Sequence, residues 1–168
     1  MKRIGLISDT HGHYDIRYAK YFSNCDEIWH AGDIGDIQVI DQLNKIAPTK
    51  VVYGNIDNHV IRSEYEMDLY FKIEEVSIFM THIGGKPYSY PKRISEKLAL
   101  LKPTVFICGH SHICKVQMDK KLNILYINPG AAGIKGFHKI RTLIRFTIDK
   151  KELKNLEVIE LGKRGKSP

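Results

Sequence analysis

Cysteine is scarce in the 168-residue sequence, which contains only Cys25, Cys108 and Cys114. The number is odd, and no two of these cysteines form a Cys-x-x-Cys pair. This pattern speaks against a disulfide framework and against a zinc knuckle. We therefore interpret the three thiols as reduced packing residues.

The chain also lacks a long hydrophobic run. Its first apolar stretch is interrupted at Ser8 and Asp9, too early for the core of a signal peptide. Lys102 and Pro103 break the longest apolar region, whereas a membrane-spanning helix needs about 20 apolar residues. The sequence thus predicts a cytoplasmic protein with no membrane segment.

Acidic residues are outnumbered, and the formal net charge is +7. Such an excess can indicate nucleic-acid binding. Lys163, Arg164 and Lys166 lie at the very end of the chain, and without these three charges only +4 remains. No compact basic run with interleaved aromatic residues accompanies them. We therefore expect one domain at 1–162 with a solvated basic tail at 163–168, and no nucleic-acid partner.

Apolar runs alternate with helical patterns over the first two thirds of the chain. The runs are mostly continuous, as in strands that are covered on both faces. Strands are expected at 3–8, 27–30, 50–53, 76–81, 104–108 and 123–128. Apolar residues at helical spacing predict helices at 14–23, 36–46 and 92–101. The alternation of the first strands with helices predicts βαβ units.

The C-terminal part of the chain has a different pattern. Residues 141–148 alternate, with Ile144 and Phe146 on one side and Arg141 and Leu143 on the other, which predicts a half-solvated strand. A second, more antiparallel sheet is expected from 115–119, 123–128, 141–148 and 156–161. The predicted fold class is α/β, with two mixed sheets packed face to face and helices outside.

Polar motifs follow six of the apolar runs. In an α/β sheet, the loops at the carboxyl ends of the strands converge and bind ligands. Seven side chains are therefore expected to meet in space, namely Asp9, His11, Asp33, Asn55, His82, His110 and His112. Imidazole and carboxylate together suit Mn, Fe, Co, Ni or Zn. We expect divalent metal ions here, with manganese as the first candidate.

Each motif by itself has an ordinary explanation. A His-x-His or an Asp-x-His is more often part of a surface loop than a pair of ligands, and Gly-Asp and Gly-Asn are common turn dipeptides. Five such motifs in order, each at the end of an apolar run, are not expected from turns alone. Their joint occurrence favours a metal site.

As an ordered set, these motifs resemble those of the calcineurin-like metallophosphoesterases. The matching segments are Asp9-Thr-His11, Gly32-Asp33, Gly54-Asn55 with Asp57, the single His82, and Gly109-His110-Ser-His112. The resemblance spans about residues 3 to 133 and is nearest to the small bacterial and archaeal phosphodiesterases. It implies an αββα sandwich and a hydrolase.

The resemblance also implies how the ligands divide. Asp9, His11, Asp33 and His112 would hold one metal ion, and Asn55, His82, His110 and the shared Asp33 would hold the second. Two divalent ions roughly 3.5–4 Å apart can bridge a hydroxide and clamp a phosphoryl group. The resemblance thus implies catalytic parts for Asp33, Asn55 and Asp57.

One position departs from the family pattern. Ile56 replaces the histidine that is thought to protonate the leaving oxygen, and His13 is a better placed substitute than His59. The Asn128-Pro129-Gly130 segment resembles the motif that shapes the floor of the site. In the basic loop around His138, the side chains of Lys135, Lys139 and Arg141 are expected to face solvent, with a phosphate contact as the alternative.

The sequence therefore predicts a two-metal phosphodiesterase that hydrolyses a small or nucleotide-like phosphodiester. One alternative is a phosphomonoesterase. Another is a protein-binding scaffold that resembles the retromer subunit and has a degenerate metal site. A homo-oligomer is compatible with the sequence, because similar small phosphodiesterases often form one.

Overall fold

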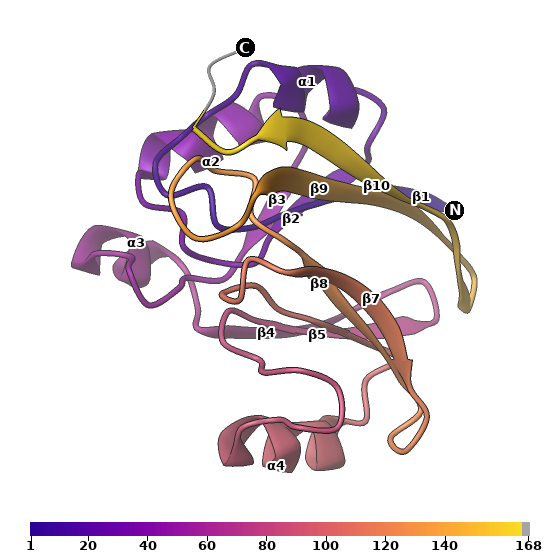
Figure 1. The fold of residues 1–168 in the computed structure, drawn as a ribbon. Helices are drawn as coiled ribbons and strands as arrows, with labels where there is room; N and C mark the ends of the chain where they lie inside the picture. Colours follow the sequence, from indigo (N-terminus) through magenta and orange to yellow (C-terminus); the bar gives the residue numbers. More distant parts are fainter. Residues whose placement is uncertain (166–168) are drawn as a thin grey trace.

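Two five-stranded sheets pack against each other in the computed structural model, which describes residues 1–165 (Figure 1). In the first sheet, three parallel strands are β1 (Lys2–Ile7), β2 (Glu27–His30) and β3 (Thr49–Val51). β9 (Ile140–Asp149) pairs antiparallel with β1, and β10 (Glu152–Lys163) pairs antiparallel with β9. The strand order is β10-β9-β1-β2-β3.

The second sheet has a parallel centre and an antiparallel strand at each edge. Its parallel strands are β5 (Val76–Thr81), β6 (Val105–Ile107) and β8 (Ile124–Pro129). The edge strands are β4 (Asp68–Ile73) and β7 (Cys114–Asp119). The strand order is β4-β5-β6-β8-β7. Both sheets are mixed, as predicted.

Helices cover the outer faces of the sandwich (Figure 1). α1 (Arg17–Phe22) and α2 (Ile37–Asn44) pack on the first sheet, and α4 (Lys92–Leu101) packs on the second. α3 (His59–Glu64) projects at one end of the sandwich. This arrangement confirms the predicted α/β sandwich. No helix within residues 1–165 is long and apolar enough to cross a membrane.

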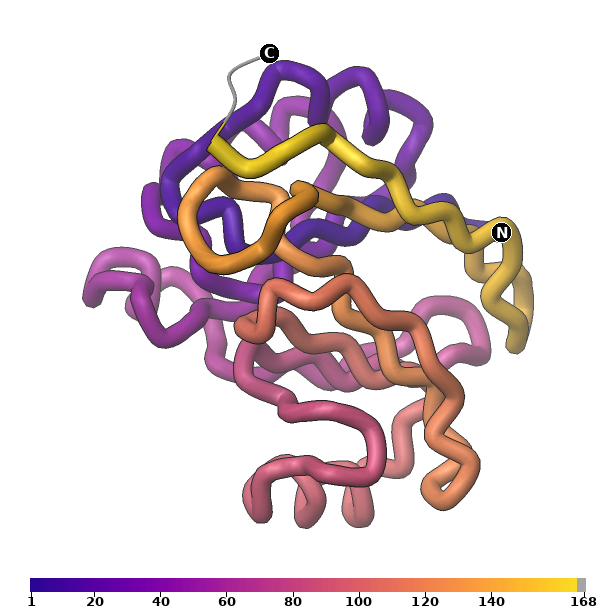
Figure 2. The backbone as a smooth tube through the Cα atoms, in the orientation of Figure 1, coloured from indigo at the N-terminus to yellow at the C-terminus, as the bar shows by residue number. Residues whose placement is uncertain are grey.

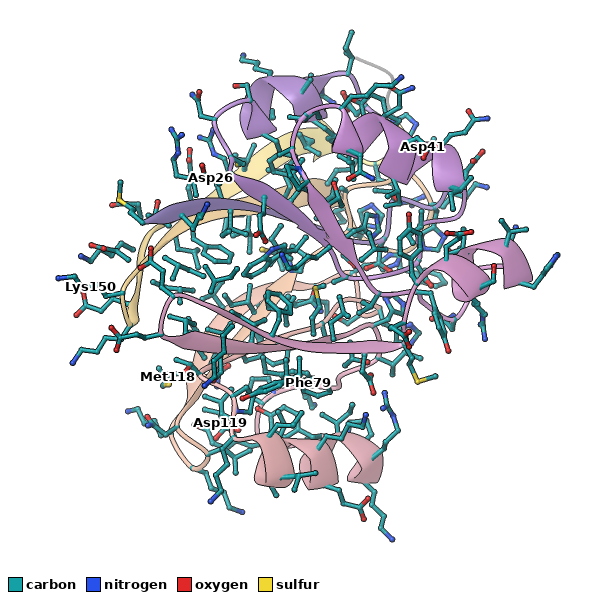
Figure 3. All side chains as sticks on the ribbon, turned by 180° about the vertical axis from the view of Figure 1, so that it is seen from behind. Asp26, Asp41, Phe79, Met118, Asp119 and Lys150 are labelled. Carbon is teal, nitrogen blue, oxygen red and sulfur yellow. The ribbon has the colours of Figure 1, made fainter. Side chains whose placement is uncertain are left out.

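The core between the sheets is apolar and closely packed. Trp29 lies edge-on to Phe71 and Phe146, with ring centroids 5.0 and 5.7 Å apart. Side chains fill the space between the layers in Figure 3, where the labelled Phe79 lies on the α4 side of the second sheet. Burying this apolar surface fixes the position of both sheets and therefore of the loops at their ends.

The predicted second sheet is wrong in its C-terminal strands. β9 and β10 extend the first sheet, because β9 pairs with the open edge of β1, with Lys2 opposite Ile148 and Leu6 opposite Ile144. The alternation along β9 identified the inward-facing side chains, but it carries no information about which strand is the partner. The sequence reading also missed β4 and α3.

The predicted solvent face of β9 is also wrong. Leu143 is buried under the helices of the first sheet, and Arg141 is only 1% exposed. Arg141 Nη2 donates to Asp15 Oδ2 at 2.9 Å, and its Nε donates to the Ala132 carbonyl at 2.8 Å. A buried guanidinium is tolerated when it is paired and hydrogen-bonded in this way.

Part of the predicted tail is ordered in the fold. Lys163 ends β10, and Arg164 donates from its backbone N–H to the Lys139 carbonyl and from Nε to the His138 carbonyl. Residues 166–168 lie outside the described residues.

Candidate metal centre

The loops that carry the polar motifs meet at one end of the sandwich. The backbone N–H of Asp9, just after β1, donates to the Gly32 carbonyl after β2. The backbone N–H of Gly109, after β6, donates to the His82 carbonyl after β5. The His110 N–H then connects the two sheets by donating to Asp9 Oδ2 at 3.1 Å. Residues about a hundred positions apart are thus neighbours.

Six of the seven predicted ligands form two groups. Asp9, His11 and His112 bring one donor atom each within 4.8 Å of one another, and so do Asp33, His82 and His110. The two groups are joined through Asp33 Oδ2, which lies 3.4 Å from His11 Nε2 and 3.2 Å from His82 Nε2. Asp33 thus lies between the two groups.

The seventh predicted ligand, Asn55, lies on the exposed loop after β3. It lines the same cavity as His82. The backbone N–H of Ile56, the next residue, donates to Asp33 Oδ1 at 3.1 Å. The loop therefore places Asn55 beside the second group.

Both aspartates are held by one oxygen and present the other. Asp9 Oδ2 accepts hydrogen bonds from Ser8 Oγ at 2.6 Å and from the His110 N–H, which leaves Oδ1 facing the histidines. Asp33 Oδ1 accepts from the Ile56 N–H, which leaves Oδ2 facing the histidines. Each carboxylate is oriented before any ligand binds, as is usual where neighbouring groups position a metal ligand.

The backbone at the site is strained. Positive φ angles between 45° and 68° occur at five of the predicted ligands, which are Asp9, His11, Asp33, His110 and His112. A left-handed conformation is uncommon outside glycine and costs about 1–3 kcal/mol per residue. Such strain persists only where the surroundings impose it, and it concentrates at functional sites. The clustering therefore marks this rim as a site.

Glycines make room for the close approach of the loops. A Cβ atom on Gly32 would lie 2.6 Å from His82 Nδ1, and one on Gly54 would lie 2.1 Å from Asp33 Oδ1. Neither position has space for a side chain. The Gly-Asp and Gly-Asn motifs thus have a packing reason that the turn interpretation does not supply.

The donor atoms fit a cation. His82 Nδ1 lies 2.8 Å from the Ala31 carbonyl, which only accepts, so Nδ1 carries the hydrogen and Nε2 presents a lone pair toward Asp33. Asp9 Oδ1, His11 Nε2 and His82 Nε2 are buried and lack a hydrogen-bond partner within residues 1–165. Buried lone pairs that face one another are stable only when a positive charge lies between them.

The carboxylates stay ionised in this setting. Burial opposes ionisation of Asp9, but the facing imidazoles of His11, His112 and His82 hold its pKa well below the usual range. Burial likewise opposes ionisation of Asp33, and His82 lowers its pKa. Burial would lower the pKa of His82, but the facing carboxylates outweigh this effect and raise it. Two negative charges therefore attract a cation to the cluster.

Asp57 lies behind the predicted ligands. It is 4% exposed, and its carboxylate accepts the backbone N–H groups of Ile34, Gly35 and Gly54 at 2.8–3.1 Å. These bonds join the loop after β2 to the loop after β3. Asp57 thus positions Asp33 and Asn55 through the backbone.

Asn128 has a comparable part on the second sheet. Its Nδ2 donates to the Gly109 carbonyl at 2.9 Å and to Ser111 Oγ at 3.0 Å. Its Oδ1 accepts the Gly130 N–H at 3.0 Å. These bonds fasten the loop that carries His110 and His112, in agreement with the part implied for the Asn128-Pro129-Gly130 segment.

Among the described residues, the side chains of His13 and His59 make fewer hydrogen bonds to the loops of the site than those of Asp57 and Asn128 do. The backbone N–H of His13 donates to the Thr10 carbonyl, and burial followed by the Arg141 charge lowers the pKa of its imidazole. His59 is the exposed first residue of α3. Within residues 1–165, neither imidazole is among the two groups of candidate ligands.

The basic loop expected to face solvent does so at Lys135 and Lys139, but Arg141 and His138 are buried. His138 is 8% exposed, and its Nδ1 lies 3.1 Å from His112 Nδ1. Its Nε2 lies 2.8 Å from the Gly133 carbonyl. A single histidine in a basic loop carries no local signal of such a contact, so sequence reasoning missed it.

The contacts of His138 fix the hydrogen positions on both rings. The Gly133 carbonyl only accepts, so His138 Nε2 carries a hydrogen. Burial lowers the pKa of His138, so the ring is neutral at neutral pH and its Nδ1 accepts. His112 Nδ1 therefore donates, and His112 Nε2 presents a lone pair toward Asp9 Oδ1 at 3.0 Å. In this tautomer, Nε2 of His112 is free to bind a metal ion.

The comparisons with known proteins agree with this geometry. Residues 1–151 match the family described as the calcineurin-like phosphoesterase superfamily domain. The chain belongs to the calcineurin-like phosphoesterase superfamily, whose metallophosphoesterases are metal-dependent hydrolases of phosphate esters. The resemblance seen in the motifs is therefore confirmed at the level of the superfamily.

Individual relatives support the same assignment. A probable metallophosphoesterase of Methanocaldococcus jannaschii is 30% identical over 168 residues, covering 94% of this chain and 82% of the relative. A solved structure described as a novel archaeal phosphodiesterase is similar with a TM-score of 0.70 at 24% identity, covering 95% of this chain and 99% of that one. Vps29 of Entamoeba histolytica complexed with Zn²⁺ gives 0.72 at 16% identity, with 95% and 98% covered. At these identities the two structures establish the fold.

We expect His138→Ala to weaken divalent-metal binding by about 10- to 100-fold, because His112 loses the acceptor that fixes its tautomer. His138→Asn, which offers a side-chain oxygen near the position of Nδ1, is expected to retain most of the affinity. Titration calorimetry with Mn²⁺ measures both, and His59→Ala is the matched control.

Nitrogen chemical shifts provide the second readout. In the metal-free parent, His112 is expected to carry its hydrogen on Nδ1 and His138 on Nε2. Equal Mn²⁺ affinity in the parent and His138→Ala, or a His112 that carries its hydrogen on Nε2, would show that His138 does not position this ligand.

Proposed function

We propose that the protein is a metal-dependent phosphodiesterase that holds two divalent cations, with manganese as the first candidate. Asp9, His11 and His112 would hold one cation, Asn55, His82 and His110 would hold the other, and Asp33 would contact both. Facing lone pairs of the two groups and the position of Asp33 between them support this arrangement.

The observation that carries the preference for diesters is a pair of neighbouring cavities that adjoin the second group of candidate ligands. The first, the His110 cavity, has a volume of about 360 Å³ and is lined by His110, Ile113 and Tyr126. The second, the His82 cavity, has a volume of about 380 Å³ and is lined by His82, Asn55 and Tyr53. Ile83 and Pro91 line both. A diester has two organic substituents, one for each cavity, whereas a monoester has one.

The charge of the centre also suits a diester. Two divalent cations against the carboxylates of Asp9 and Asp33 leave about +2, and the loss of a proton from a water at the site reduces this to about +1. Asn55 adds no charge. A phosphodiester monoanion matches this remaining charge of about +1, and the substrate does not need a second negative charge.

When bound, the pair of cations supplies a water of lowered pKa and stabilises the charge that develops on the phosphoryl oxygens. The protein's own residues hold the reacting groups in place. The water oxygen forms a bond to phosphorus and loses a proton to solvent, and the P–O bond to one substituent breaks. Its electron pair stays on the leaving oxygen, which takes up a proton. The products are a phosphomonoester and an alcohol.

A scaffold function is the alternative from another class, because Vps29 structures share the fold. Fold similarity at 16% identity does not transfer a function to this chain. The complete set of candidate ligands and the two adjoining cavities support catalysis. A small nucleotide-like diester fits cavities of this size, since ligand pockets are typically about 300–1,000 Å³.

We expect the Mn²⁺-loaded protein to hydrolyse bis(p-nitrophenyl) phosphate, and Asp33→Ala and His110→Ala to lower the rate by at least about 10²-fold through loss of a cation. Asp33→Asn keeps the shape of the side chain, so its loss of activity separates the chemistry from folding. Asp41→Asn and His59→Ala are exposed controls. Turnover that is equal in Asp33→Asn and the parent would contradict the mechanism.

The proton for the leaving oxygen is assigned to His13, since Ile56 has no proton to give. Loss of a general acid costs about 10²–10⁴-fold for a poor leaving group and little for a good one. His13→Gln should therefore slow the hydrolysis of an alkyl diester by at least about 10²-fold and leave release of p-nitrophenolate nearly unchanged. Equal effects on the two substrates would exclude His13 from this role.

A further inference from the structure

Two basic side chains line each cavity, Lys86 and Lys115 in the His110 cavity and Arg62 and Arg93 in the His82 cavity, but these side chains differ in their partners. The His110 cavity lies beneath the segment that connects β5 with α4, which crosses the outer face of the second sheet in Figure 2. Ile83, Pro91, Ile113 and Tyr126 give it apolar walls. Among the described residues, its lining includes the lysines Lys86 and Lys115 and no carboxylate.

The two lysines are free to bind a ligand. None of the ion pairs found within residues 1–165 includes Lys86 or Lys115. In the His82 cavity, by contrast, Arg93 Nη1 pairs with Asp68 Oδ2 at 2.7 Å. Arg62 there donates to the Asp57 and Asn55 carbonyls. The basic side chains of the His82 cavity are thus engaged with protein atoms, although Arg62 has no ion pair, whereas Lys86 and Lys115 have no side-chain partner among the described residues.

The segment that carries Lys86 is anchored. Tyr90 OH donates to Asp119 Oδ2 at 2.8 Å, and Tyr88 OH accepts the Lys120 N–H at 3.1 Å. Tyr126 OH donates to the Gly85 carbonyl at 2.8 Å, directly before Lys86. These bonds fix the backbone over the sheet, so the wall of the cavity is formed before a ligand enters. A preformed wall lowers the ordering cost of binding.

From this asymmetry we propose that the His110 cavity binds a substrate substituent that combines a flat apolar body with an anionic group of its own. The proposal rests on the proposed function, since the scissile phosphate would lie at the metal centre. The apolar body packs against Tyr126 and Ile113, and the additional carboxylate or phosphate lies between Lys86 and Lys115. A nucleotide unit with a second phosphate belongs to this class.

Matched synthetic diesters test the proposal. Benzyl p-nitrophenyl phosphate and its 4-carboxybenzyl and 4-phosphonooxybenzyl analogues share one leaving group and differ only in the distal charge. We expect kcat/KM of the Mn²⁺-loaded parent to be about tenfold higher for the charged analogues, mainly through KM, because about 1.4 kcal/mol corresponds to a factor of ten. The ratio of kcat/KM between the 4-carboxybenzyl and the 4-phosphonooxybenzyl analogue identifies the preferred anion.

The lysine variants locate the effect. In Lys86→Gln/Lys115→Gln, the preference for the analogues with a distal charge should disappear, while kcat/KM for the unsubstituted benzyl diester changes less than about twofold. Lys45→Gln on the distant α2 end is the control. A parent that hydrolyses all three diesters equally, or a preference that survives in the double variant, would overturn the proposal.

A binding experiment distinguishes failure of this proposal from failure of the proposed function. Benzyl and 4-carboxybenzyl methylphosphonates carry the same single charge at phosphorus and resist hydrolysis. If the Mn²⁺-loaded parent binds the 4-carboxybenzyl compound about tenfold more tightly, and the double variant does not, the cavity has the proposed specificity even when no diester is hydrolysed. Equal binding of the two compounds by the parent refutes the specificity and leaves the hydrolase assignment in place.

Discussion

The structure depends on an electrostatic constraint at the meeting point of the two sheets. Asp9 and Asp33 each direct one carboxylate oxygen toward imidazole nitrogens whose other ring atoms are held by the protein, as for His82 at the Ala31 carbonyl. These lone pairs repel one another in a buried setting unless a cation lies among them. The left-handed backbone at five predicted ligands adds a conformational cost. The remainder of the fold maintains this arrangement.

Each sheet of the sandwich contributes part of this cluster of side chains. The first sheet delivers Asp9, His11 and Asp33 on the loops after β1 and β2, and the second delivers His82, His110 and His112 on the loops after β5 and β6. The apolar core between the sheets fixes the distance between the two sets. Asp57 and Asn128 then fasten the loops through backbone hydrogen bonds. Such rims generally bind ligands because loops with functional side chains converge there and the strands that carry the loops are rigid.

The sequence predicted the positions of several strands and helices better than it predicted the sheet topology. Apolar runs followed by Asp, Asn or His are local signals, so strands 27–30 and 76–81 and the helix at 92–101 were placed correctly. The partner of a strand is a long-range property, so β9 and β10 were assigned to the wrong sheet. The burial of Arg141 and His138 depends on Asp15, Gly133 and His112, which are distant in the chain or unremarkable in sequence. A positive φ angle at a residue other than glycine cannot be read from the amino-acid composition.

The central claim concerns cation occupancy, and anomalous diffraction from crystals soaked in Mn²⁺ measures it directly. We predict two peaks about 3.5–4 Å apart, one beside Asp9, His11 and His112 and the other beside Asn55, His82 and His110, with Asp33 touching both. A single peak that lies away from Asp33, or no peak at this rim under saturating Mn²⁺, would contradict the account.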